Sequence, residues 1–265
     1  MPFMMKIPFA NRHASCLLHN GLKVIALSFA LVVSGCSDSD SDPDTESTDS
    51  QAPANADNPS DVSSDSATQA SYRLTFNAIW SDSTHSLNFP GNPHFSGLVG
   101  AVHNEQIRFW EPAQIATPGI QRMAETGGKS TLLAEVQTAI DSGLALAEIS
   151  GGGIARSPGT TAIEFTVSRD YPQITLTSML APSPDWFIGL HNYPLLVDGQ
   201  FIESATIELP LYDSGSDNGA QYTSANDAAD PLSPIATVSS DPLDSPFTDG
   251  TPSVGSFTLE RLSVQ

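Results

Sequence analysis

The chain has 265 residues, of which 30 are acidic and 10 are basic, so its formal net charge at pH 7 is −20. This excess of negative charge excludes nucleic acid as an electrostatic partner, and it also excludes charge-driven binding to anionic lipid. The two cysteines, Cys16 and Cys36, both lie near the N-terminus. The rest of the chain therefore offers no thiol for a disulfide, a nucleophile or a metal site.

Residues 1–35 are predicted to be an export signal. They carry three basic residues and no acidic one. The apolar run 24–33 is within the usual signal-peptide range of roughly 7–15 residues and is shorter than the roughly 20 that a membrane span needs. The run ends in Val33-Ser-Gly-Cys36, which resembles the bacterial lipobox, so Cys36 is predicted to carry the lipid that anchors the mature chain. An uncleaved anchor and an ordinary signal peptide remain the alternatives. Ser37 favours sorting to the outer membrane.

Residues 36–70 are predicted to be a disordered acidic tether. They are rich in Ser and Asp, with nine acidic residues, no basic residue and only one large apolar side chain, Val62. Such a segment cannot bury enough apolar surface to offset the entropy of ordering. Its Ser-Asp repeats superficially resemble a calcium motif, but the glycine turn and distal glutamate of a calcium loop are missing, which favours a solvated spacer.

Residues 71–265 are predicted to form one all-β domain. Apolar and polar residues alternate in several segments separated by Gly, Pro, Asn and Asp, which is typical of half-buried strands. One segment, 130–140, instead places its apolar side chains on one helical face, with Ser130 as a candidate N-cap. We therefore expect an antiparallel β-sandwich with a short helical insertion. The strand segments are 72–80, 163–167, 174–180, 207–211 and 257–259.

Two loops carry the candidate binding chemistry. Asp213 and Asp217 lie on either side of Gly215, and Asp185 lies between a proline and a tryptophan at a predicted strand end. Carboxylates around a glycine turn suit Ca²⁺, a hard cation that takes about six to eight oxygen ligands, better than zinc or copper. Plain surface turns have the same composition, so both interpretations stay open at this point.

The domain resembles the spondin N-terminal family, which includes F-spondin and mindin. The resemblance begins at Tyr72-Arg-Leu-Thr-Phe-Asn-Ala-Ile-Trp80 and ends at Leu259-Glu-Arg-Leu262. Its most specific motifs are Pro182-Ser-Pro-Asp-Trp-Phe-Ile-Gly189 and Tyr212-Asp-Ser-Gly-Ser-Asp-Asn-Gly219. The family's Asp-Ala-Gly-Thr-Asp is Asp-Ser-Gly-Ser-Asp in this chain, which keeps both acids.

The resemblance implies an eight-stranded antiparallel sandwich that binds calcium through Asp185, Asp213 and Asp217. It also implies extracellular work in adhesion and matrix recognition. In mindin, a glutamate that matches Glu125 takes part in integrin recognition, so Glu125 is a candidate partner-binding residue. A solvated acid before a turn is the alternative for that position.

An enzymatic role has little support in the sequence. His85, His94 and His103 are not spaced as a zinc helix requires, and no His-Glu-x-x-His, Gly-x-Ser-x-Gly or phosphate-binding loop is present. We therefore expect a non-enzymatic, calcium-binding recognition module on the bacterial cell envelope, facing the periplasm or the cell surface. Its expected partners are the membrane, through the lipid on Cys36, and an envelope or extracellular protein or glycan. The alternatives are a metal-assisted envelope hydrolase at the same aspartates and a carbohydrate-binding module that stacks sugars on its tryptophans, Trp80, Trp110 and Trp186.

Overall fold

The computed structural model describes residues 66–86, 88–238 and 253–265. The predicted signal peptide, the lipid on Cys36 and the tether up to residue 65 lie outside the described residues. Within the described ranges, no helix combines the length and the apolar character that crossing a bilayer requires.

Four antiparallel strands form the first sheet, in the order β10-β13-β1-β5. The predicted alternation along the first strand is confirmed, because Tyr72, Leu74 and Phe76 are buried while Arg73 between them is exposed. This strand starts at Gln69, slightly before the predicted domain boundary. The strands are β1 (Gln69–Ala78), β5 (Gly159–Ser168), β10 (Ser204–Glu208) and β13 (Gly255–Val264).

The second sheet is also antiparallel, with the strand order β12-β11-β7-β6-β3-β4 and a short strand, β2, that pairs with β6. Over the described ranges, eight strands have five or more residues and five have only two, in agreement with the expected sandwich. The strands are β2 (His94–Phe95), β3 (Val99–His103), β4 (Ala145–Ser150), β6 (Gln173–Ala181), β7 (Trp186–Pro194), β11 (Tyr212–Asp213) and β12 (Ala236–Thr237), with β8 (Leu196–Val197) and β9 (Gln200–Phe201) forming a separate hairpin.

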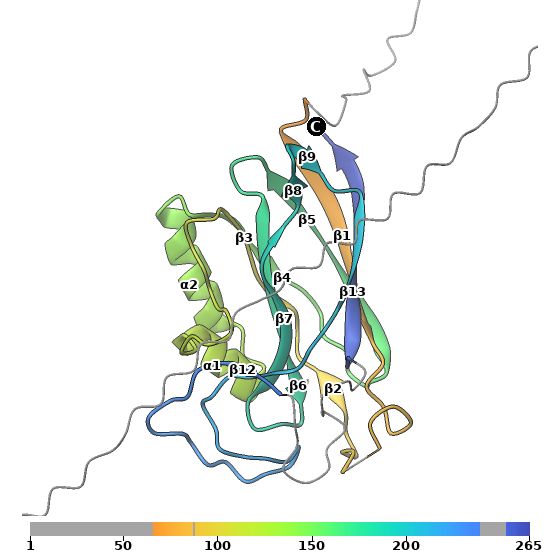
Figure 1. Ribbon diagram of the computed structural model, residues 1–265, viewed down its shortest axis with the longest axis vertical. Helices are drawn as coiled ribbons and strands as arrows, with labels where there is room; N and C mark the ends of the chain where they lie inside the picture. Colours follow the sequence, from red (N-terminus) through yellow and green to blue (C-terminus); the bar gives the residue numbers. More distant parts are fainter. Residues whose placement is uncertain (1–65, 87, 239–252) are drawn as a thin grey trace, which may run out of the picture. The chain divides into compact units, whose positions relative to one another are not determined.

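Two helices, α1 (Pro118–Thr126) and α2 (Ser130–Asp141), lie beside the second sheet (Figure 1). The predicted helical insertion is confirmed by α2, but Ser130 is its first helical residue and Lys129 occupies the N-cap without a side-chain bond. Helix α1 was not expected. Thr117 caps it by accepting a hydrogen bond from the amide of Ile120, and Gly127 ends it in a left-handed conformation at φ 67°.

The second sheet is covered on both faces, and the side chains of its strands point alternately into two cores. In β6, Ile174 and Leu176 belong to the core between the sheets. Met179, on the opposite face of the same strand, packs in a second core with apolar residues of α1 and α2, among them Ile120 and Val136. A strand that is buried on both faces gives a nearly continuous run of buried residues, as β6 does.

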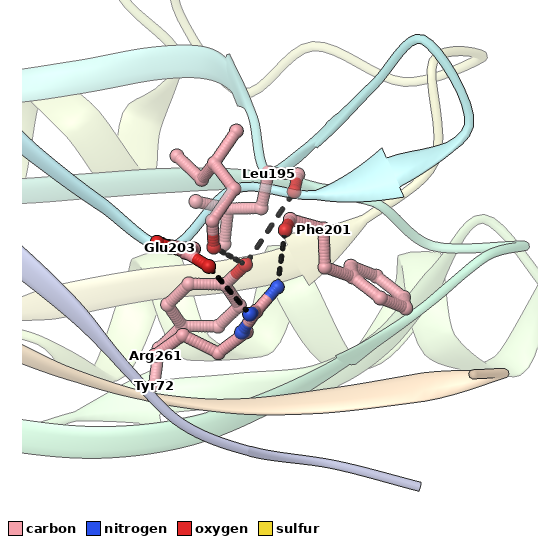
Figure 2. Close-up of polar contacts among 6 residues, drawn as sticks. Tyr72, Leu195, Phe201, Glu203 and Arg261 are labelled. Carbon is pink, nitrogen blue, oxygen red and sulfur yellow. Dashed lines mark hydrogen bonds and ion pairs between the residues drawn. The ribbon is translucent and has the colours of Figure 1, made fainter. Parts of the chain in front are cut away.

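The hairpin β8–β9 is tied to the first sheet by polar contacts (Figure 2). The Tyr72 hydroxyl donates to the carbonyl of Ile202 at 2.7 Å, and Arg261 Nη1 donates to the carbonyl of Phe201 at 2.5 Å. At the same end of the sheet the amide of Thr68 donates to the carbonyl of the C-terminal Gln265 at 2.6 Å. The two ends of the domain therefore meet, and its cores are built from its own residues, so we expect a soluble chain 66–265 to fold alone.

Candidate functional site

Strand pairing brings the two predicted aspartate loops together. Asp185 ends the turn between β6 and β7, and Asp213 lies in β11, opposite Trp186 of β7. The amide of Ser214 donates to the backbone carbonyl of Asp185 at 3.2 Å. This register places the carboxylate of Asp185 directly beside the Asp-Ser-Gly-Ser-Asp turn that starts at Asp213.

The carboxylate of Asp185 is fully buried, with 0 % of the residue exposed. Its Oδ2 accepts from the amides of Ser216 (2.8 Å) and Asp217 (3.1 Å), and from the hydroxyls of Ser214 (2.9 Å) and Ser216 (3.2 Å). Its Oδ1 has no hydrogen-bond partner among the residues that the structure describes. Burial raises the pKa of Asp185, against the lowering effect of these hydrogen bonds. One oxygen of this buried carboxylate therefore accepts four hydrogen bonds, whereas the other accepts none from the described residues.

Asp213 belongs to the same site, and the charges of the neighbouring carboxylates affect it. Its Oδ1 accepts from the amide of Gly215 at 2.7 Å, and its Oδ2 accepts from the indole nitrogen of Trp186 at 3.3 Å. Burial raises the pKa of Asp213 to about 6, and the charges of Asp185 and Asp217 contribute to this rise. Asp213 is therefore repelled by both neighbouring carboxylates in a poorly solvated turn.

Gly215 allows the turn to close over the carboxylates. Its φ is +74°, and a Cβ at this position would lie 2.0 Å from the carbonyl oxygen of Ser233. Any other residue would clash there as well as strain the backbone. The glycine of the predicted motif is thus required by the conformation of the loop.

Asp217 links the site to the next loop. Its Oδ1 accepts from the amide of Gly219 at 2.7 Å, and its Oδ2 accepts from the amide of Asp227 at 2.9 Å. Tyr222, at the centre of this 218–227 loop, is buried against Trp80 and Trp186, with ring centroids 5.4 and 5.5 Å apart. Asp217 therefore holds both ends of a loop that packs into the core.

A calcium site at these loops would have to combine the carboxylates with other oxygens. In the part of the chain that the structure describes, no three acidic, histidine or cysteine side chains are grouped so that they alone could hold a metal ion. A calcium ion does not need such a group, because it also binds backbone carbonyls and water. A carboxylate oxygen that accepts one amide also keeps a lone pair for a cation. The residues therefore fit calcium better than a metal that requires an all-side-chain cage.

Glu125, the candidate partner-binding residue, lies on another element. It is half-buried on the last turn of α1, where its Oε1 accepts from Gln121 Nε2 at 2.9 Å. The structure thus places Glu125 on the helical layer, and the three aspartates on loops that flank β7 and β11. Cys36 lies outside the described residues.

Each of the histidines at positions 85, 94 and 103 has its own local role. The Nδ1 atom of His85 contacts the Thr84 hydroxyl at 2.8 Å, and that of His94 contacts the Asn92 carbonyl at 2.9 Å. His103 is buried in β3. The tryptophans are also structural, because Trp80, Trp110 and Trp186 are all buried, so none of them presents an open face for stacking a sugar.

The surroundings of His103 predict how the free energy of unfolding depends on pH. Its Nδ1 lies 2.7 Å from the carbonyl of Asn104, which can only accept, so this bond assigns the proton to Nδ1 and leaves Nε2 to accept from the Thr175 hydroxyl at 2.8 Å. Burial lowers the pKa of this neutral ring. Below the unfolded pKa of about 6.5, His103 binds a proton in the unfolded chain but not in the folded chain. Its contribution to the free energy of unfolding is therefore complete above that pH and declines below it.

We expect the free energy of unfolding of the wild type to approach that of His103→Gln as the pH falls from about 7.5 to about 5. Urea denaturation of both proteins across this range measures the difference. Taking the difference removes the opposite trend of Asp213, whose raised pKa favours the folded state on acidification. A difference that does not change with pH would contradict the prediction.

The residues that sequence reasoning missed at the site are Ser214 and Ser216. Both are buried, their hydroxyls lie 2.8 Å apart, and both donate to Asp185. Their only signal in the sequence is their position between the aspartates of the Asp-Ser-Gly-Ser-Asp motif.

Comparison with known proteins gives a consistent result. The Spondin_N family model matches residues 70–251. Spondin-1 of Gallus gallus is 32% identical over 197 residues, which cover 72% of this chain and 24% of that protein. Spondin-1 of Homo sapiens is 31% identical over 196 residues, with 71% and 24% covered. Spondin-2 of Homo sapiens is 28% identical over 207 residues, with 73% and 62% covered. The match thus spans about a quarter of the Spondin-1 relatives.

Proposed function

This chain belongs to the spondin N-terminal family, and on that premise we propose that it is a calcium-binding, non-enzymatic adhesion or recognition module, displayed on the bacterial cell envelope by a lipid on Cys36. Its partner is an envelope or extracellular protein or glycan. The comparisons support recognition through the family, and the aspartate loops support the ion.

The observation that carries the calcium proposal is the carboxylate of Asp185. A buried carboxylate oxygen without a partner is costly, and the neighbouring Asp213 and Asp217 add repulsion. A divalent cation bound by Asp185, Asp213 and Asp217 would remove both penalties. Backbone carbonyls and water would supply its remaining ligands.

The burial of the site supports a structural ion. Asp185 is fully buried and Asp217 is 7 % exposed, whereas a metal-assisted hydrolase needs an open metal position for water and substrate. Each of the three carboxylates also accepts at least one backbone amide. The ion would therefore join the loops at 185 and 213–217 to each other, and recognition would use the surface around them.

The position of the loops suits a tethered module. The described chain enters the sandwich at β1, beside the C-terminus, while the segment 214–235 lies at the opposite end of the sandwich (Figure 1). A lipid tether that joins at β1 would leave the aspartate loops at the free end of the domain. Because the predicted tether is a flexible chain, it would leave that end accessible to a partner without fixing the orientation of the domain.

Calorimetric unfolding of a soluble chain 66–265 tests the calcium site. Calcium at about 100 times its dissociation constant should stabilise the wild type by about 2.7 kcal/mol relative to chelator. For a domain of this size the midpoint should rise by roughly 5–10 °C. Asp213→Asn should lose this shift, whereas Asp170→Asn, at an exposed residue in the turn after β5, should keep it. Equal midpoints with calcium and with chelator in the wild type would refute the site.

A further inference from the structure

Strand β5 is a long edge strand without the usual protection. It is ten residues long and pairs with β1 in an unbroken register from Gln69↔Ser168 to Ala78↔Gly159. The described residues place no strand on its other side. Natural edge strands are commonly short, bulged, or marked by lysine or proline. Strand β5 is long and regular, has no lysine or proline, and carries a single charged residue, Glu164. Its sequence, Gly-Thr-Thr-Ala-Ile-Glu-Phe-Thr-Val-Ser, is rich in residues that favour strands.

The edge also leaves apolar surface incompletely covered. Ile163 and Phe165 point toward the core between the sheets but are only half-buried, although Phe165 stacks on Tyr72 at 6.1 Å. By contrast, Leu74 and Phe257, on the inner strands of the same sheet, are fully buried. A further strand beside β5 would complete the burial of both residues.

We propose that β5 pairs with the β5 strand of a second copy of this chain. The two strands would run antiparallel about a two-fold axis and would join two four-stranded sheets into one continuous sheet. A closed two-fold pair of this kind covers the β5 edge of both copies, so pairing through β5 ends at two copies. This inference does not depend on the calcium site.

Charge selects the register of this pairing. Glu164 is the one charged residue of β5, and Arg73 of the same copy pairs with it at 2.6 Å. If Ile163 faces Ile163 of the second copy, then Glu164 faces Ala162, and Thr166 faces Thr160. In this register, each residue whose side chain points toward the core lies opposite another such residue. The register shifted so that Glu164 faces Glu164 would oppose two like charges.

The net charge of the domain acts against the pairing and makes a separate prediction. Residues 66–265 carry 21 acidic and 7 basic residues, so two copies repel each other. Added salt screens this long-range repulsion but not the backbone hydrogen bonds between the strands. The dimer should therefore become stronger as sodium chloride is added.

Sedimentation velocity of the soluble chain 66–265 over a range of concentrations tests the dimer. In this dimer, Ala162 of each copy faces Glu164 of the other. Ala162→Glu would therefore create two pairs of like charges, and it should raise the dissociation constant several-fold. Ala162→Lys would attract the same residue, and should lower it. The matched controls are Thr206→Glu and Thr206→Lys. Thr206 lies in the same row of the sheet, through Thr258 and Thr75, but on the opposite edge strand, and both controls should dimerise as the wild type does.

Hydrogen exchange gives an independent measure. Amides of β5 that point away from β1 should exchange more slowly as the concentration of the chain rises, while those of β10 should not change. A chain that stays monomeric at every concentration and salt level would overturn the proposal. So would a dimer that Ala162→Glu and Thr206→Glu weaken equally.

Discussion

Asp185→Ala is expected to lower the free energy of unfolding of the calcium-free protein by about 3–5 kcal/mol. The substitution removes the acceptor of two backbone amides, Ser216 and Asp217, and of two serine hydroxyls. These donors are buried, and only the two serine hydroxyls have an alternative partner, each other at 2.8 Å, whereas each unsatisfied donor costs about 1–3 kcal/mol. Urea denaturation in chelator measures the loss.

Two matched variants separate the structural role of Asp185 from its proposed role as an ion ligand. Ser214→Ala removes one of the donors to Oδ2 and leaves the other three, so it should cost only about 1 kcal/mol. Asp185→Asn keeps an acceptor oxygen for the turn and removes the charge. It should therefore be more stable than Asp185→Ala in chelator and yet gain nothing from calcium. A loss below 1 kcal/mol for Asp185→Ala would show that Oδ2 does not organise the loop.

The sequence predicted the strands best where one face of a strand is solvated. In β1 the alternation of buried Tyr72 and Leu74 with exposed Arg73 was visible in the residue pattern alone. The segment 207–211 also alternates, but β10 ends at Glu208. Leu209 and Leu211 are buried beyond the strand. Pro210 has no amide for a ladder bond, which explains why the pattern continues and the pairing does not.

Helix α1 was missed because its signals are local and weak. It has nine residues, with Pro118 and Gly119 at its start, and its buried face consists of only four residues. It is stabilised by packing rather than by propensity. Ile120 and Met123 are buried against the second sheet, and Glu135 of α2 accepts from the amide of Gly119 at 2.7 Å. Contacts of this kind depend on tertiary structure, which no residue pattern in the segment reveals.

The three acids of the candidate site could be named from the sequence. The distribution of hydrogen-bond donors over their oxygens could not. The motif around Gly215 singled out Asp213 and Asp217, and Asp185 was named from its place between a proline and a tryptophan. The resemblance to the family implied all three. That Asp185 has one oxygen with four donors and another with none follows from the pairing of β11 with β7. Such asymmetry requires the register of the sheet, so it becomes visible only in the folded chain.

Tyr222→Ala is the second large effect that we expect, a loss of about 3–5 kcal/mol in the free energy of unfolding. The ring of Tyr222 is 4 % exposed and packs on both Trp80 and Trp186, and the Trp80 indole nitrogen donates to its hydroxyl at 3.3 Å. Alanine would leave a cavity under the 218–227 loop. Tyr222→Phe keeps the ring and loses the hydrogen bond from Trp80, so its cost should be about 1 kcal/mol.

The position of Tyr222 also couples the loop to the aspartates. Trp186, which contacts Tyr222, donates to Asp213 at 3.3 Å, and Asp217 holds the loop at the amides of Gly219 and Asp227. Tyr222→Ala should therefore weaken calcium binding severalfold and shift the fluorescence of Trp80 and Trp186 toward that of solvated indole. Titration calorimetry and emission spectra of the folded variant measure the two effects. If Tyr222→Ala binds calcium as tightly as the wild type, then the loop and the ion site are independent, and the ion joins only the turns at 185 and 213–217.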